Sequence, residues 1–177
     1  LNAVSEARGL IDNWEIGHAV DDLPPGPVVL IGSSLGAFAA LHLAERCDRI
    51  DQLVLLAPAL DFGSNRMREI GKDGLASWRQ TGWLQMRDYA SGEERRVHYG
   101  LYADAARYDS FAVRRVIPTL LLQGHHDEIV EPALAGRFAA SRPHVRVVML
   151  DDGHQLKASL DRIWSEIAVF LGLGNQL

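Results

Sequence analysis

The chain has 177 residues, of which 47% are hydrophobic, and a formal net charge of −5 at pH 7, so we expect one domain with a substantial core. The negative charge argues against nucleic acid as a main partner, and no run of about 18 apolar residues offers a membrane span. The start lacks a signal-peptide pattern and Cys47, the single cysteine, cannot form an internal disulfide, so a cytoplasmic protein is the default expectation.

The chain opens with an amphipathic pattern. Between residues 1 and 20, apolar residues recur at helical spacing, namely Val4, Ala7, Leu10, Ile11 and Trp14. The proline-rich stretch 21–27 then ends the predicted helix, because proline removes backbone donors and disfavours helix at the preceding residue.

A short apolar run at 28–31 breaks at Gly32 and restarts as an alanine-rich helical pattern. Its centre fits Gly-x-Ser-x-Gly with Ser34 in the middle, an arrangement that places a serine on a sharp strand-to-helix turn. We expect Gly32 and Gly36 to lie where strand and helix pass too closely for a Cβ. The Leu35 N–H, at the helix start, is the expected oxyanion donor. Taken alone, the motif fits an ordinary small-residue turn equally well.

Strand and helix patterns alternate through most of the remaining chain. Buried strands are predicted at 51–57, 119–124 and 145–150, and helices from 37 to about 47, at 132–141 and at 160–171. The last helix carries one apolar stripe, formed by Leu160, Ile163, Trp164, Ile167, Phe170 and Leu171. This alternation predicts an α/β fold with a parallel sheet and helices on both faces.

Residues 60–115 interrupt that rhythm, and we interpret them as a short, partly helical lid or cap insert within a single domain spanning 1–177. The insert carries ten basic and eight acidic residues, whereas the remainder carries eight and fifteen. It also holds the aromatic residues that we consider for substrate binding, Trp78, Trp83, Tyr99 and Tyr102. The alternative is a connecting segment with a solvated arginine face.

An acid and a histidine follow two of the predicted strands. Asp127 comes three residues after Gly124, and His154 comes just beyond the next strand. Loops at the carboxyl ends of parallel strands gather at one edge of the sheet, so both can reach Ser34. The order Ser, Asp, His is that of the α/β-hydrolases, and the three residue types predict a catalytic triad.

The neighbours of Asp127 leave alternatives open. Glu128 is adjacent, and Asp151 and Asp152 stand too near His154 in sequence to be its usual partner. The sequence His125-His126-Asp127 could suggest a metal site, but adjacent residues at a strand end point in alternating directions, and we expect no metal.

These motifs resemble those of the α/β-hydrolase superfamily of serine hydrolases. Within it, the segments 31–36, 124–128 and 153–154 resemble the bacterial YqiA-type esterases, in which a Gly-Ser-Ser-Leu-Gly elbow recurs. The resemblance implies esterase or thioesterase activity on small to medium acyl groups, without a cofactor, in a monomer or homodimer. Such proteins usually begin with further strands and a His-Gly segment that supplies a second oxyanion donor. Neither occurs before residue 28, so we expect N-terminal strands to be missing from the printed chain.

The resemblance and the residues together assign roles: Ser34 as nucleophile, His154 as base and Asp127 as the group that orients it. Two alternatives stay open. One is another serine-dependent hydrolysis, of a C–C or peptide bond, and the other is a non-catalytic binding protein on the same fold.

Overall fold

The computed structural model describes residues 19–87 and 92–173, and the chain divides into two compact units. The sheet unit comprises Leu23–Leu60 and Phe111–Leu177, and the insert unit comprises Leu1–Asp22 and Asp61–Ser110. The helix predicted within residues 1–20 lies almost wholly outside the described residues. None of the described helices is long and apolar enough to cross a bilayer.

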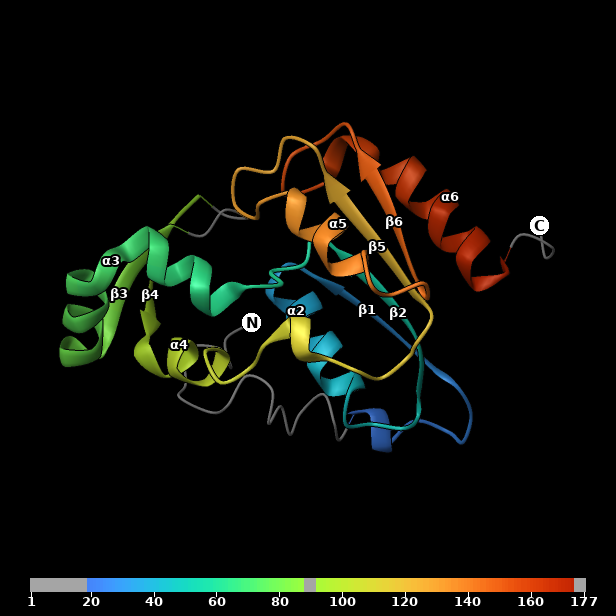
Figure 1. The fold of residues 1–177 in the computed structure, drawn as a ribbon, viewed down its shortest axis with the longest axis horizontal. Coiled ribbons are helices and arrows are strands. Elements are labelled where there is room, and N and C mark those ends of the chain that lie inside the picture. Colours follow the sequence, from blue (N-terminus) through green and yellow to red (C-terminus); the bar gives the residue numbers. More distant parts are fainter. Residues whose placement is uncertain (1–18, 88–91, 174–177) are drawn as a thin grey trace. The chain divides into compact units, whose positions relative to one another are not determined.

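The sheet unit is built on four parallel strands in the order β1-β2-β5-β6 (Figure 1). Its elements are β1 (Val28–Ser33), α2 (Leu35–Ala44), β2 (Ile50–Leu56), β5 (Thr119–Gly124), α5 (Ala133–Ala139), β6 (Val145–Leu150) and α6 (Leu160–Leu171), with short 3-10 turns at Ser110–Ala112 and Lys157–Ser159. The strands predicted at 51–57, 119–124 and 145–150 are found within one residue of those bounds, and β1 extends two residues beyond the predicted apolar run at 28–31. The predicted α/β class is confirmed.

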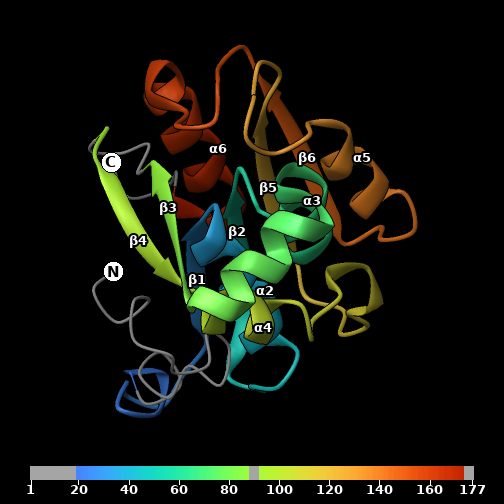
Figure 2. The same ribbon diagram turned by 90° about the vertical axis from the view of Figure 1, so that its left-hand side faces the viewer.

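Helices cover both faces of this sheet (Figures 1 and 2). Side chains alternate between faces, so Val54 of β2, Leu120 of β5 and Leu150 of β6 point to one side, where they pack with Ile163 and Ile167 of α6. The intervening residues point to the other side, which α2 and α5 cover. All six residues of β5 are buried, which explains its nearly continuous run of leucine.

The apolar stripe predicted along α6 is only partly buried. Ile163 and Ile167 lie in the core, but Leu160 is 62% and Trp164 61% exposed, which corrects the expectation of one buried stripe. On α6, Glu166 accepts a 2.7 Å hydrogen bond from Arg146 of β6.

The insert unit contains α3 (Phe62–Thr81), β3 (Trp83–Arg87), β4 (Glu94–His98) and α4 (Tyr99–Ala105). The helices agree with the partly helical insert that the sequence predicts, but the antiparallel pair β3-β4 was not predicted. Trp78 is the largest fully buried side chain there, and its indole N–H donates to the Val97 carbonyl at 3.0 Å. It therefore links α3 to the β3-β4 pair.

Candidate active site

Ser34 stands on a strained turn between β1 and α2. Its backbone has φ 51° and ψ −116°, a conformation that L-residues rarely adopt and that must be held by its surroundings. The Ser34 N–H donates to the Leu56 carbonyl at 2.8 Å, and the Ser34 carbonyl accepts from Ala37, Phe38 and Ala59. These bonds hold the turn at the carboxyl end of the sheet.

The two glycines flanking Ser34 are not equivalent. A Cβ on Gly32 would lie 2.5 Å from the Gly36 carbonyl oxygen and 2.7 Å from Cα of Ala37, so only glycine fits there. A Cβ on Gly36 would meet no atom outside its own helix within 4 Å. The expectation of a close approach is confirmed for Gly32 and wrong for Gly36, because Gly36 is on the exposed side of the first turn of α2.

The loops after β5 and β6 are bound to each other along their backbones. The His125 N–H donates to the Leu150 carbonyl at 2.8 Å, and the His126 N–H donates to the Asp152 carbonyl at 3.0 Å. A Cβ on Gly124 would collide with the carbonyl oxygens of Asp152 and Gly153. The sequence Gly124-His125-His126 thus sets the distance between the loop that carries the acid and the loop that carries the histidine.

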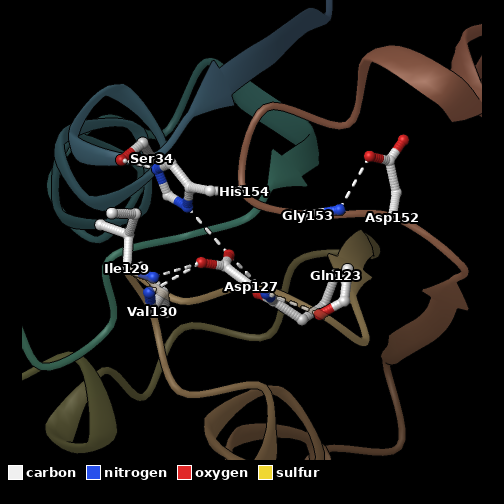
Figure 3. Close-up of polar contacts among 9 residues, drawn as sticks. Ser34, Gln123, Asp127, Ile129, Val130, Asp152, Gly153 and His154 are labelled. Atoms are coloured by element: carbon white, nitrogen blue, oxygen red, sulfur yellow. Dashed lines mark hydrogen bonds and ion pairs between the residues drawn. The ribbon is translucent and has the colours of Figure 1, made fainter. Parts of the chain in front are cut away.

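The side chains of Ser34, His154 and Asp127 form one hydrogen-bonded row (Figure 3). His154 Nε2 lies 2.9 Å from Ser34 Oγ, and His154 Nδ1 lies 2.8 Å from Asp127 Oδ2. The three residues come from the turn after β1 and from the loops after β5 and β6, so the structure brings together the residues that the sequence singled out.

Asp127 is buried but well supplied with donors. Its Oδ1 accepts the N–H groups of Ile129 and Val130 at 2.9 and 2.8 Å, and its Oδ2 accepts from His154 and from the side-chain amide of Gln123, each at 2.8 Å. Burial by itself raises the pKa of Asp127, but the bonds from His154, Val130, Ile129 and Gln123 outweigh it and hold the pKa below its ordinary value. The carboxylate is therefore ionised at neutral pH.

The three carboxylates that the sequence offers as alternatives to Asp127 are exposed or have other partners. Glu128 is exposed, Asp151 pairs with His126 at 2.8 Å, and Asp152 Oδ1 accepts the N–H of Gly153. Within residues 19–87 and 92–173, no group of three or more His, Cys, Asp or Glu side chains is placed to hold a metal ion.

Leu35 is the first residue of α2, so its N–H has no acceptor within the helix. The amide therefore lies at the positive end of the helix dipole, directly after the serine. This is the position from which one backbone donor can meet an oxyanion.

The aromatic residues considered for substrate binding lie in the insert unit. Trp78, Tyr99 and Tyr102 form a cluster with ring centroids 5.7 to 5.8 Å apart. Trp83 is 38% exposed, with the Arg96 guanidinium 4.7 Å from its ring centroid. The burial of Trp78 favours a packing role, and substrate contact stays a prediction for the four residues.

Gln123 is the site residue that sequence reasoning missed. It is 1% exposed in a strand whose other residues are apolar or small, apart from Thr119 at its start. A buried amide must be paired, so its position one residue before Gly124 was an available signal for a polar partner nearby.

This arrangement can perform acyl transfer. A histidine bonded to a serine hydroxyl can take its proton as the oxygen attacks a carbonyl, and an ionised carboxylate on the far ring nitrogen fixes the tautomer and stabilises the imidazolium that forms. A water can then repeat the sequence on the acyl-enzyme.

Comparison with known proteins identifies relatives in sequence and in structure. A family model described as uncharacterised protein family UPF0227 matches residues 10–171. Lipase LipV of Mycobacterium tuberculosis (strain ATCC 25618 / H37Rv) is 44% identical over 59 residues, a match that spans 33% of this chain and 23% of the lipase.

Two solved structures share the fold. Mouse alpha/beta hydrolase domain-containing protein 10 superposes with a TM-score of 0.72 at 24% identity, covering 90% of this chain and 68% of that one. The monoacylglycerol lipase of Paleococcus ferrophilus superposes with a TM-score of 0.71 at 16% identity, covering 94% of this chain and 76% of that one. The fold is that of the α/β-hydrolases.

Proposed function

Because this chain belongs to the uncharacterised protein family UPF0227 and has the α/β-hydrolase fold, we propose that it is a serine hydrolase that cleaves carboxylic ester or thioester bonds. The observation that carries the proposal is the row Ser34–His154–Asp127, with distances of 2.9 and 2.8 Å between its polar atoms. The distance between Ser34 and His154 is within the reach that proton transfer requires, and the distance between His154 and Asp127 is that of a hydrogen bond.

In the proposed reaction, Ser34 Oγ forms a bond to the acyl carbonyl carbon while its proton passes to His154 Nε2. His154 returns that proton to the leaving alcohol or thiol as the C–O or C–S bond breaks, and Asp127 stabilises the imidazolium between the two transfers. Water then attacks the acyl-enzyme with His154 again as base. His154 returns that proton to Ser34 Oγ as the bond between Oγ and the acyl carbon breaks and the carboxylic acid leaves. The Leu35 N–H donates to the oxyanion at each stage.

The substrate class rests on the chemistry of the site and on the relatives. LipV and the monoacylglycerol lipase are named as lipases, which supports an oxygen ester as the first substrate to examine. The small to medium acyl length stays a prediction from the sequence. A role for Trp78, Trp83, Tyr99 and Tyr102 in holding the acyl chain is part of the proposal. A cytoplasmic location and a monomeric or homodimeric state stay predictions from the sequence.

The test uses two adjacent serines. The full chain is treated with a fluorophosphonate probe, and the adduct is located by mass spectrometry, for the natural sequence, Ser34→Ala and Ser33→Ala. We expect one adduct, on Ser34, which Ser34→Ala abolishes together with hydrolysis of 4-nitrophenyl butyrate. Ser33→Ala is the matched control and should label. Unlabelled natural protein, or equal hydrolysis by Ser34→Ala, would contradict the proposal and favour a binding protein on this fold.

A further inference from the structure

Gln123 is a polar residue in a fully buried position, which calls for an explanation. It is the fifth residue of β5, and all six residues of that strand are buried. An unpaired amide in such a place destabilises a fold, whereas a leucine there would not. A glutamine in this position therefore needs a compensating partner.

Its partners define which end of the amide faces the site. Gln123 Nε2 lies 2.8 Å from Asp127 Oδ2 and 3.3 Å from the Gly124 carbonyl oxygen. Both neighbours are acceptors, so the nitrogen and not the oxygen of the amide has to face them. The two N–H bonds of the amide are thus directed at one carboxylate oxygen and one backbone carbonyl.

The same carboxylate oxygen serves His154. Asp127 Oδ2 accepts from Gln123 and from His154 at equal distances of 2.8 Å, while Oδ1 accepts only the backbone N–H groups of Ile129 and Val130 among the bonds that the described residues make. The backbone donors come with the fold of the loop. Gln123 is the neutral side chain that competes with His154 for the charge on Oδ2.

We propose that Gln123 is a positioning residue that fixes the rotation of the Asp127 carboxylate and withdraws charge from the oxygen that holds His154. The inference rests on the proposed function. A neutral donor on Oδ2 keeps the carboxylate aimed at Nδ1 and makes it less basic, so His154 gives up its proton more readily when it acts as acid toward the leaving group.

The loops after β5 and β6 carry further ionisable side chains besides Asp127 and His154. After β5 these are His125, His126, Glu128 and Glu131, which are exposed, and after β6 they are Asp151 and Asp152. His126 pairs with Asp151, and Asp152 Oδ1 accepts from Gly153. A His126→Asn background therefore measures how much this pair contributes to any pH profile.

The test replaces the donor while keeping the volume. Gln123→Met removes both N–H groups, and Leu121→Met is the matched control because Leu121 is a fully buried residue two positions earlier on the same strand face. For Gln123→Met we expect kcat on 4-nitrophenyl butyrate to fall about 10-fold to 100-fold with KM within about twofold, as for loss of a hydrogen bond to a charged group. The acid limb of kcat/KM should move to higher pH, because a more basic carboxylate holds the His154 proton more tightly.

Gln123→Glu preserves the shape of the side chain and should reverse the pH dependence of activity that is expected for Gln123→Met. When protonated, the new carboxyl group can still donate to Asp127, but when ionised it repels it, so activity relative to the natural protein should be highest near pH 5 and fall toward pH 8. The low-field proton resonance of the His154–Asp127 bond should shift in both variants and not in Leu121→Met.

The outcomes separate the two claims. Natural protein that fails to label with the fluorophosphonate overturns the proposed function. Natural protein that labels, with Gln123→Met and Gln123→Glu showing the pH profile and proton resonance of Leu121→Met, overturns only the role of Gln123. Opposite pH trends in the two Gln123 variants support it.

Discussion

His154 Nε2 and Ser34 Oγ lie 2.9 Å apart although 120 positions separate the two residues in the chain. The contact depends on three strand ends that reach one edge of the sheet and on a close contact between the loops after β5 and β6. Each of these supports can be removed separately, and each removal should have a different effect.

Asp127 can be distinguished from its neighbour by two isosteric changes. Asp127→Asn should lower kcat about 10⁴-fold, because an amide in place of the carboxylate favours the wrong tautomer of His154 and cannot stabilise its cation. Glu128→Gln changes an exposed side chain and should leave kcat within about twofold. Hydrolysis of 4-nitrophenyl butyrate measures both, and a large loss in Glu128→Gln alone would transfer the acid role to Glu128.

The lowered pKa of Asp127 predicts how stability depends on pH. A carboxyl group whose pKa is lower in the folded state stabilises the fold at pH values above its ordinary pKa of 3.8, and this contribution is lost as pH falls through the lowered folded value. The difference in unfolding free energy between the natural protein and Asp127→Asn should therefore be larger at pH 7 than at pH 3. Urea titrations at the two pH values measure it, and a difference that grows on acidification would contradict the expected sign.

Gly32 and Gly36, the glycines that flank Ser34, can be compared by the effect of alanine on the free energy of unfolding. Gly32→Ala forces a Cβ to 2.5 Å from the Gly36 carbonyl oxygen, so backbone has to move and unfolding free energy should fall by about 1–3 kcal/mol. Gly36→Ala meets nothing outside its helix and should be neutral or stabilising by up to about 1 kcal/mol. Urea denaturation tests the pair, and equal losses in both variants would show that the approach of strand and helix is not the constraint.

Gly124 is expected to act on the geometry of the site. In Gly124→Ala, the Cβ collides with the Asp152 and Gly153 carbonyl oxygens and pushes the His154 loop away from Asp127, so kcat should fall at least about 100-fold. Gly153→Ala is the control, because its Cβ would lie at an ordinary 3.8 Å from the His126 carbonyl oxygen. Activity of Gly124→Ala equal to that of the control would mean that the loops can separate without cost.

Replacing Trp78 and replacing Trp83, both in the insert unit, should have different effects. Trp78→Ala removes a fully buried ring and its bond to Val97, and should cost about 3–5 kcal/mol in stability. Trp83→Ala removes a ring that is 38% exposed and should cost less, while raising KM for longer acyl chains if the ring binds substrate. A KM that is independent of acyl length in Trp83→Ala would remove this residue from the substrate proposal.

The parts of the fold that the sequence predicted well are those in which one local pattern decides the structure. Residues 119–124 and 145–150 are apolar runs bounded by clear breaks, and both strands lie at the predicted bounds. The β3-β4 pair was missed because its sequences, Trp-Leu-Gln-Met-Arg and Glu-Arg-Arg-Val-His, have neither a continuous apolar run nor a hairpin turn of two residues.

Other features depend on tertiary packing that no local pattern contains. The exposure of Trp164 follows from how α6 is rotated against β6, and the freedom at Gly36 follows from which side of α2 faces the sheet. The proposed roles of Ser34, Asp127 and His154 rest on order and residue type, whereas the proposed role of Gln123 rests on a contact with Asp127 that only the structure shows.

The bond from the Ala59 N–H to the Ser34 carbonyl, 3.2 Å long, gives the turn a built-in reporter. Ala59 lies outside the helices and strands, where backbone amides ordinarily exchange with solvent hydrogen quickly. Its exchange rate should instead follow the opening of the strained turn. The exchange of this single amide therefore measures how often the turn that carries Ser34 opens while the sheet remains folded.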